Sequence, residues 1–440
     1  MRPPKPGARP ERVSLWRYWR MFRRDILSAQ PEKLYRAKMA EFRTPFFRSF
    51  LINEPELVRR VLVEKAEDFP KSDRVTKGLR PLLGRSVFVT NGAEWEHQRR
   101  IIDPAFEGGR LSKSFNAMLE AGDAAAGRVE PGVLDVEAWA SHATADVIFR
   151  TLFSIPIEDE IARETYQAFR TFQREQPVGT IGALIPWLPT RTPRAAREAA
   201  RRLRDLVDEL VSRKKAEIQE VGAADDLASK IMTTPDPLTG ETFSEAEMVD
   251  QVAIFFLAGH ETSAALLGWA LWCLAAAPEW GEEVTEEAGV FVENPAFSEL
   301  SRMRVTRNVL REVLRLYPPV PMFVREATRP EIFRKRDVSP GSQVVISPWH
   351  LGRHEALWER PDEFDPSRWE RGQPAPREAW LPFSTGARVC PGAGFAMAEA
   401  AVLLAFLMAR FRFEVMEEPV PVAHLTVRSR DGIRLRVSRR

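Results

Sequence analysis

Residues 383–392 read Phe-Ser-Thr-Gly-Ala-Arg-Val-Cys-Pro-Gly and place Cys390 in a glycine-punctuated loop just ahead of an apolar helix. A cysteine there lies near the positive end of the helix dipole, and nearby N–H groups can point at its sulfur, so both effects favour the thiolate. A thiolate suits a soft metal ion, while Gly386 and Gly392 let the backbone approach a flat partner closely. Arg388 can reach an anion on the same side. For an isolated cysteine in such a loop, an inert buried residue would be the simpler interpretation.

The decapeptide matches every fixed position of Phe-x-x-Gly-x-Arg-x-Cys-x-Gly and resembles the haem-binding loop of the cytochrome P-450 family. The resemblance implies that Cys390 is the metal ligand, the axial thiolate of haem b that favours O–O cleavage in that family. It also implies that Phe383 packs near the sulfur and that Gly392 and Arg388 belong to the cofactor site. Cys273 lies in an apolar helix and is expected in the core.

Residues 258–262 read Ala-Gly-His-Glu-Thr and interrupt a long apolar helix that a capping box is expected to start. Taken alone, the interruption indicates a kink with a threonine bonded back to its own helix. The stretch resembles the family's distal oxygen-binding groove. That resemblance implies catalytic roles for Thr262, which would steady dioxygen, and for Glu261, which would relay protons. It also places Ala258 and Gly259 against the cofactor.

Two further motifs concern charged side chains. Trp95 and Arg99 are four residues apart, so one helix face presents an indole and a guanidinium that suit carboxylates, although a plain basic amphipathic helix is an equal alternative. The pair resembles the family's haem-propionate ligands, and by the same resemblance Arg325 and Arg388 are the second and third propionate arginines.

Glu312 and Arg315 are one helical turn apart, which alone indicates only an ordinary pair. Together with Arg368 they resemble the family's Glu-Arg-Arg cluster, which locks the core around the cysteine loop. We therefore assign the three residues to folding and not to catalysis.

The amino-acid composition excludes several functional classes for this protein. The chain has 440 residues, of which 44% are hydrophobic and 29% charged, and 64 Lys and Arg balance 62 Asp and Glu. That balance excludes a protein whose main function is to bind nucleic acid through a broad positively charged surface. Two cysteines cannot build a disulfide scaffold, a four-cysteine zinc site or an iron–sulfur cluster. The resemblance therefore implies that electrons come from outside, from a ferredoxin or flavodoxin with its reductase.

The organisation expected from the sequence is mainly α with a small β-rich part. Residues 1–25 form a basic tail and 26–440 a single haem domain, and the resemblance implies the cytochrome P-450 fold, a triangular helical prism with haem between the distal long helix and the cysteine-loop helix. An amphipathic helix is predicted over 194–218. Residues 177–193 are predicted to form an apolar loop, which is either a lid or packed against the domain. A C-terminal hairpin is predicted to join 424–427 to 433–437.

Two segments bear on membranes. Trp16, Trp19 and Phe22 fall at helical spacing among arginines, which allows a surface-lying amphipathic helix, but a tail that packs its aromatic rings onto the domain is favoured. Residues 251–278 are apolar enough to span a bilayer, yet they carry an ionisable pair at the centre and are predicted as a core helix. The sequence therefore predicts a soluble, cytoplasmic monomer without a transmembrane segment.

The resemblance implies a haem-thiolate monooxygenase that hydroxylates or epoxidises a fatty acid, terpenoid, steroid or carotenoid. A peroxygenase that uses hydrogen peroxide and a non-catalytic haem protein are the alternatives; the Glu261-Thr262 pair argues against the first and Thr262 against the second. The substrate pocket is expected from apolar side chains: Leu82, Val87, Phe88, Ile254, Ala258, Val320, Met322, Phe323 and Val324.

Overall fold

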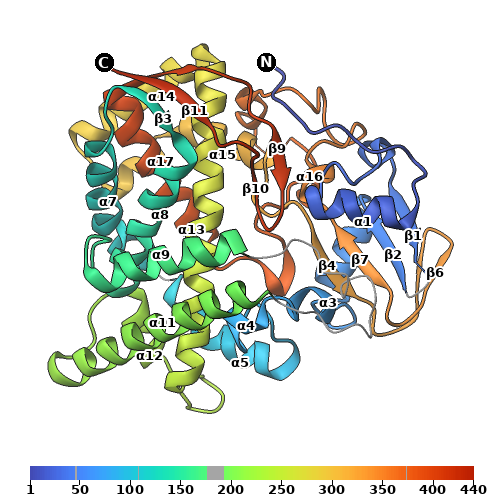
Figure 1. Ribbon diagram of the computed structural model, residues 1–440, viewed down its shortest axis with the longest axis horizontal. Helices are drawn as coiled ribbons and strands as arrows, with labels where there is room; N and C mark the ends of the chain where they lie inside the picture. The colour runs from blue at the N-terminus through green and yellow to red at the C-terminus, as the bar shows by residue number, and fades with distance from the viewer. Residues whose placement is uncertain (45–46, 108, 176–192, 373) are drawn as a thin grey trace.

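The computed structural model describes residues 1–44, 47–107, 109–175, 193–372 and 374–440. Helices dominate this part of the chain, and the largest sheet lies at one end of the molecule, away from α7, α14 and α17 (Figure 1). The mainly helical class predicted from the sequence is confirmed. The apolar loop predicted over 177–193 lies, apart from Pro193, outside the described residues.

The described helices are α1 Leu15–Arg24, α2 Pro55–Arg59, α3 Asp73–Thr76, α4 Arg80–Leu83, α5 Gly92–Ile102, α6 Arg110–Lys113, α7 Phe115–Gly127, α8 Val136–Phe153, α9 Glu160–Glu175, α11 Arg194–Val221, α12 Leu227–Thr233, α13 Glu245–Ala276, α14 Pro278–Glu293, α15 Arg304–Leu316, α16 Pro348–Leu351 and α17 Ala393–Arg410. The strands are β1 Met39–Arg43, β2 Arg48–Ile52, β3 Gly132–Asp135, β4 Phe323–Glu326, β5 Glu331–Phe333, β6 Arg336–Val338, β7 Gln343–Ile346, β8 Phe411–Val415, β9 Pro421–Ala423, β10 Val427–Ser429 and β11 Arg434–Arg439.

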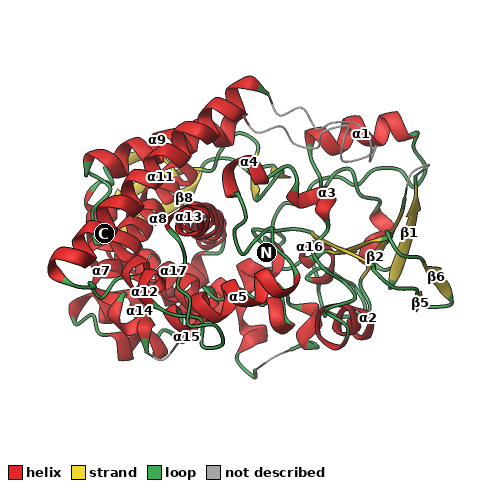
Figure 2. Ribbon diagram, turned by 90° about the horizontal axis from the view of Figure 1, so that it is seen from below, coloured by secondary structure: helices red, strands yellow, loops and turns green. Residues whose placement is uncertain are grey.

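Helix α13 runs through the middle of the helical part, and Figure 2 shows it end-on among its neighbours. It begins at the predicted capping box: Ser244 Oγ accepts the Glu247 N–H at 3.3 Å, and Glu247 Oε2 accepts the Ser244 N–H at 2.9 Å. Its first half packs with α8, α9 and α11, and its second half with α15 and α17. Because both halves are covered, the helix is apolar nearly all round.

Helices α13 and α17 are each long and apolar enough to cross a membrane, but most of their residues are buried inside the fold. That burial is typical of core helices, as predicted for 251–278. Cys273 is fully buried in α13, also as predicted. The amphipathic helix predicted over 194–218 is α11, whose apolar stripe is buried.

The strands form small sheets. β1, β2, β7 and β4 lie side by side in that order, with β2 and β7 parallel and the other pairs antiparallel. β5 pairs with β6, β9 with β10, and β11 lies between β3 and β8. In the first of these sheets β4 places Arg325 beside the segment just before α3, since Arg325 forms a bridge to Lys71.

The C-terminal hairpin predicted for 424–427 and 433–437 is wrong. β10 pairs with β9, whereas β11 pairs with β8 and β3, so the turn at Gly432 only connects two different sheets. Leu435 and Val437 explain the difference, because both are buried and β11 therefore pairs where its apolar face meets the core.

The N-terminal aromatic residues do not all pack onto the domain as expected. Trp16 is 66% exposed, and α1 contains no buried residue. The packing expectation fails there because Tyr18 and Phe22, four residues apart, share a different face of α1 from Trp16.

Candidate functional site

The loop that carries Cys390 closes on itself. The Cys390 N–H donates to the Phe383 carbonyl at 2.9 Å, and Ser384 and Gly386 have φ values of 62° and 74°. A Cβ on Gly386 would lie 2.2 Å from the carbonyl oxygen of Leu62. Glycine is therefore required for this backbone conformation and for the close packing. The Phe383 ring itself is partly buried and lies edge-on to Trp380, 6.3 Å between centroids.

The thiol of Cys390 is free and accessible from within the fold. Loss of hydration at this depth raises the pKa of the thiol, while the Gly392 N–H and Arg99 act to lower it. The thiolate predicted from the loop alone is therefore not favoured by the protein by itself. A coordinated metal cation would produce it, because coordination deprotonates a thiol.

One face of α13 is accessible, although the helix is otherwise buried. Ala258 is exposed and Phe255, Gly259 and Thr262 are partly exposed. The i, i+3, i+4, i+7 spacing places them on one face, which we name the open stripe of α13. Three of the four, all except Phe255, were predicted as site residues.

Phe106 links the open stripe to the cysteine loop. Its ring lies 6.0 Å from that of Phe255, and its edge is 3.9 Å from the Cβ position of Gly392. The Cβ position of Gly392 is in turn 4.0 Å from Cys390 Sγ. The accessible thiol and the accessible stripe are therefore neighbours around one aromatic side chain.

Thr262 and Gly259 show two different local contacts. Thr262 Oγ1 donates to the Ala258 carbonyl at 2.6 Å, the bond back to its own helix that the sequence allowed. The oxygen of a hydroxyl in this bond can still accept a hydrogen bond from a ligand. The close approach expected at Gly259 is made by Ile148 of α8, whose Cδ1 would be 2.5 Å from a Cβ on this glycine.

The Glu261 carboxylate is buried and fully engaged. Arg428 and Thr426, from β10 and the residue before it, contact Oε1, the threonine hydroxyl at 2.8 Å. Gln173 of α9 donates to Oε2. Sequence reasoning missed these partners, because they lie more than 80 residues away along the chain and belong to no motif.

Four predicted carboxylate-binding residues gather at one place. The guanidinium of Arg99 lies 5.9 Å and that of Arg388 5.0 Å from the centroid of the Trp95 ring. Arg99 also donates to the Val389 carbonyl at 2.8 Å, so α5 holds the cysteine loop directly. Burial and the charge of Arg388 lower the pKa of Arg325 to about 10.

Lys71 joins this cluster and was missed from the sequence. Its Nζ lies 5.6 Å from the Trp95 ring and donates to the carbonyls of Val87 and Thr90 at 2.6 and 3.0 Å. Burial, followed by the charges of Arg325 and its neighbours, lowers the pKa of Lys71 to about 6. No local pattern around Lys71 indicates this, since only the fold brings the cations together.

These cations lack carboxylate partners. Among the described residues, no ion pair joins Lys71, Arg325 or Arg388 to an acid, and the buried Nε of Arg388 has no hydrogen-bond partner. Buried cations are normally paired. A ligand that brings carboxylates would pair with the two arginines and would favour the charged form of Lys71.

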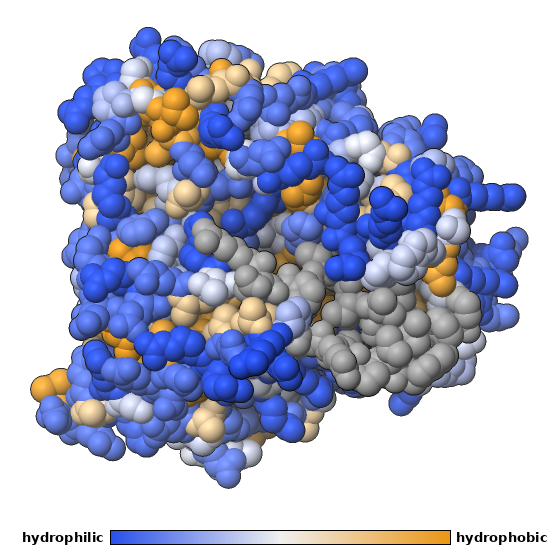
Figure 3. All heavy atoms as spheres, in the orientation of Figure 1, coloured by the Kyte–Doolittle hydropathy of each residue, from blue (hydrophilic) through white to orange (hydrophobic). Residues whose placement is uncertain are grey.

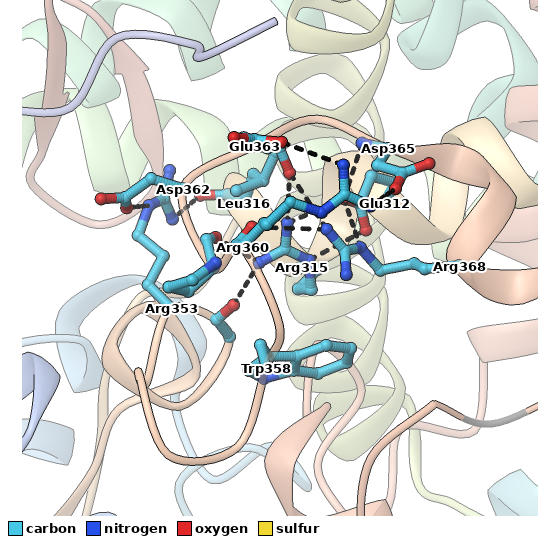
Figure 4. A network of polar contacts seen from close by, with 12 residues as sticks. Glu312, Arg315, Leu316, Arg353, Trp358, Arg360, Asp362, Glu363, Asp365 and Arg368 are labelled. Carbon is cyan, nitrogen blue, oxygen red and sulfur yellow. Dashed lines mark hydrogen bonds and ion pairs between the residues drawn. The ribbon is translucent and has the colours of Figure 1, made fainter.

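The cluster of Glu312, Arg315 and Arg368 forms as the sequence suggested (Figure 4). Arg315 binds Glu312 through two nitrogens at 2.9 and 2.7 Å, and Arg368 Nε donates to the same carboxylate at 2.9 Å. Burial favours the neutral acid, but the two arginines outweigh it and hold the pKa of Glu312 below its ordinary value. Arg315 further donates to the carbonyls of Gly352, Pro361 and Glu363. The network thus joins α15 to the chain that leads to the cysteine loop.

The predicted substrate residues divide into two groups. Leu82 and Ile254 are packed in the core with α8 and α11, so they are not accessible in this structure. The remaining apolar side chains are exposed or partly exposed: Val87, Phe88, Ala258, Val320, Met322, Phe323 and Val324.

The donor set fits a flat cofactor that carries carboxylates and a soft-ligated metal. Cys390 supplies an accessible sulfur, the open stripe of α13 supplies an apolar wall, and the unpaired cations supply partners for carboxylates. This combination defines a haem-thiolate protein.

Comparison with known proteins agrees with that class. A family model described as Cytochrome P450 matches residues 27–431, so the chain belongs to the cytochrome P450 family. Two relatives from Streptomyces melanosporofaciens are a cyclooctat-9-en-7-ol 5-monooxygenase, 33% identical over 87% of this chain and 83% of its own length, and a cyclooctatin synthase, 34% identical over 84% and 81%.

More distant matches also cover most of this chain. Human cytochrome P450 4A11 is 29% identical over 84% of this chain and 76% of its own length. The crystal structure of the cytochrome P450DA heme domain has a TM-score of 0.82 at 24% identity, covering 99% of this chain and 97% of its own. The P450 fold is therefore confirmed, and the protein is a haem-dependent monooxygenase with a cysteine thiolate ligand.

Proposed function

We propose that this cytochrome P450 monooxygenase hydroxylates or epoxidises a hydrophobic terpenoid-class substrate, with electrons from a separate ferredoxin or flavodoxin. The observation that carries the proposal is the open stripe of α13, where Phe255, Ala258 and Gly259 share one accessible helix face with the Thr262 hydroxyl. An apolar wall with one polar group selects an apolar substrate and orients it at one position.

Different residues would bind the metal and the carboxylates of the cofactor. Cys390 would provide the metal ligand, and Trp95, Arg99, Arg325 and Arg388 would hold the propionate carboxylates, with Lys71 as a further donor. When bound, haem supplies the oxygen chemistry, which inserts one atom of dioxygen into the substrate and releases the other as water. The Glu312 cluster keeps the cysteine loop in place.

Protons are handled on the α13 side. The Thr262 hydroxyl donates to Ala258 and so presents its oxygen lone pairs to the open stripe. Glu261, the adjacent residue, is buried and ion-paired with Arg428, whose side chain is 28% exposed. Because this carboxylate is also held by Thr426 and Gln173, it would have to release one of these partners before it could exchange a proton with the open stripe.

The terpenoid class is supported by the two Streptomyces relatives, whose names refer to cyclooctat-9-en-7-ol and cyclooctatin. The test is a spectral titration of the haem-loaded protein with apolar cyclic alcohols, including cyclooctat-9-en-7-ol, and with long-chain fatty acids. We expect a spin-state shift and an oxygenated product with a cyclic alcohol. Product formed only from fatty acids would contradict the terpenoid assignment.

The same preparation tests the two alternatives. Turnover with hydrogen peroxide and none with reduced ferredoxin would indicate a peroxygenase, and no turnover under either condition would indicate a non-catalytic haem protein. A cytoplasmic location belongs to the proposal as well.

A further inference from the structure

Helix α1 presents arginine and tryptophan side chains on a face that the rest of the protein leaves uncovered. Trp16 is 66% exposed and Leu15 41%. Trp16, Arg20 and Arg23 follow i, i+4, i+7 spacing and therefore share one face. Among the described residues, Arg17 and Arg20 make no side-chain hydrogen bond or ion pair, and α1 contains no acidic residue.

The helix is held in place at both ends and is not a loose tail. On the N-terminal side, Arg9 is 7% exposed and its Nε donates to the Ala29 carbonyl at 2.6 Å. Further upstream, the Tyr317 hydroxyl donates to the Pro4 carbonyl at 2.7 Å. On the C-terminal side, the buried Asp25 carboxylate accepts N–H groups of the following turn and of Ala423.

Two aromatic pairs separate the inner and outer sides of α1. The Tyr18 and Phe22 rings are 5.8 Å apart, and Arg9 lies over Tyr18 at 5.5 Å, so this pair meets the anchored segment. The Trp16 and Trp19 rings stack at 4.7 Å, and Arg23 lies over Trp19 at 4.9 Å. Of the second pair, Trp16 faces outward and Trp19 is partly buried, with the Arg23 guanidinium over its ring.

We propose that α1 is an interfacial helix that docks the protein onto the surface of an anionic phospholipid bilayer. Indole rings favour the membrane–water interface, and arginines on an amphipathic helix bind anionic headgroups. The charge selects the occupant, since a helix face that carries arginines, no acid and the exposed Trp16 is complementary to an acidic lipid surface.

Docking through α1 would orient the whole molecule. Figure 2 shows α1, α9 and α11 along one side of the protein, and Figure 3 shows hydrophilic side chains around paler ones over α1 on that side. Because both ends of α1 are anchored, a bilayer bound by α1 would lie next to α9 and α11. The inference is independent of the substrate proposed above.

The test is cosedimentation of the haem-loaded protein with phosphatidylcholine vesicles, prepared with and without phosphatidylglycerol. We expect binding only with phosphatidylglycerol and weakening by high salt. The double variant Arg17→Gln/Arg20→Gln should bind at least about tenfold more weakly, given the usual contribution of each basic residue. Trp16→Ser should also lower binding.

Matched controls separate α1 from net charge. Arg412→Gln/Arg436→Gln removes two exposed arginines from β8 and β11, and Leu238→Ser removes an exposed apolar side chain that is 76% exposed. These variants should bind as the unmodified protein does. The proposal would be overturned if the control variants lost as much vesicle binding as the α1 variants, or if the protein bound neutral vesicles equally well. It would also be overturned if the protein bound no vesicles, including the case in which α1 contacts only an acidic redox partner.

Discussion

At the scale of single residues, the buried cluster of Lys71, Arg325 and Arg388 lowers the stability of the haem-free protein, because these side chains have no carboxylate partners. Lys71 is buried against Arg325 and Arg388, and its pKa falls from 10.5 to about 6. Between these values the unfolded chain binds a proton that the folded, haem-free protein does not. Stability of the haem-free protein should therefore rise with pH across this window, by up to about 1.4 kcal/mol per pH unit.

Lys71→Met tests this assignment. Urea unfolding of the haem-free variant should show greater stability at neutral pH and a weaker pH dependence between 6 and 10.5. Haem retention should fall at the same time, because one donor to the carboxylates is lost. Unchanged pH dependence in the variant would contradict the assignment of the titration to Lys71.

Thr262→Ala isolates the hydroxyl on the open stripe. Haem content and the substrate-induced spectral shift should stay unchanged, while product formed per electron pair falls at least about tenfold and hydrogen peroxide increases. Thr262→Ser, which keeps a hydroxyl, should retain most of the coupling. Tight coupling in the alanine variant would remove Thr262 from proton handling.

Gly386→Ala should destabilise the protein in two ways, through backbone strain at a positive φ and through overlap of the new Cβ with its neighbours. A second glycine, Gly240, isolates the first of these effects. Gly240 has nearly the same φ, 75°, but its Cβ would meet nothing within 4 Å. Gly240→Ala should therefore cost only about 1 kcal/mol for the backbone conformation. Gly386→Ala should cost more and reduce haem retention, since its Cβ would overlap the Leu62 carbonyl. Equal costs, measured by urea unfolding, would contradict the packing argument.

At the scale of elements, the Glu312 cluster joins α15 to the segment before the cysteine loop. Glu312→Gln leaves two arginines with a weaker partner inside the fold, and we expect a loss of about 3–5 kcal/mol in unfolding free energy. Arg302→Gln is the matched control, since Arg302 pairs with Glu299 at the surface and should cost less than about 1 kcal/mol. A small effect of Glu312→Gln would show that the cluster is dispensable.

The elements also show where sequence reasoning succeeds. The capping box at Ser244 and the apolar stripe of α11 are local patterns, and the structure bears out both. Strand pairing is not local: β11 alternates in the way a hairpin strand does, but the choice between β10 and β8 depends on where the core lies. The hairpin prediction failed for that reason.

At the scale of the whole molecule, residues grouped in a motif could be placed before the structure was known, and isolated ones could not. Trp95, Arg99, Arg325 and Arg388 were each found through a motif, and the fold brings them together. Lys71 lies next to this group, and Arg428 contacts Glu261, but both come from segments without any motif. Their roles depend on burial and on neighbours distant in sequence, neither of which a single sequence displays.

The measurement that tests the account most directly is the carbon monoxide difference spectrum of the reduced, haem-loaded protein, compared with Cys390→Ser. We expect a strongly red-shifted Soret band in the unmodified protein, as thiolate ligation produces, and its loss in the variant. A band typical of histidine or neutral thiol ligation, or the same band in Cys390→Ser, would contradict the assignment of Cys390 as the ligand.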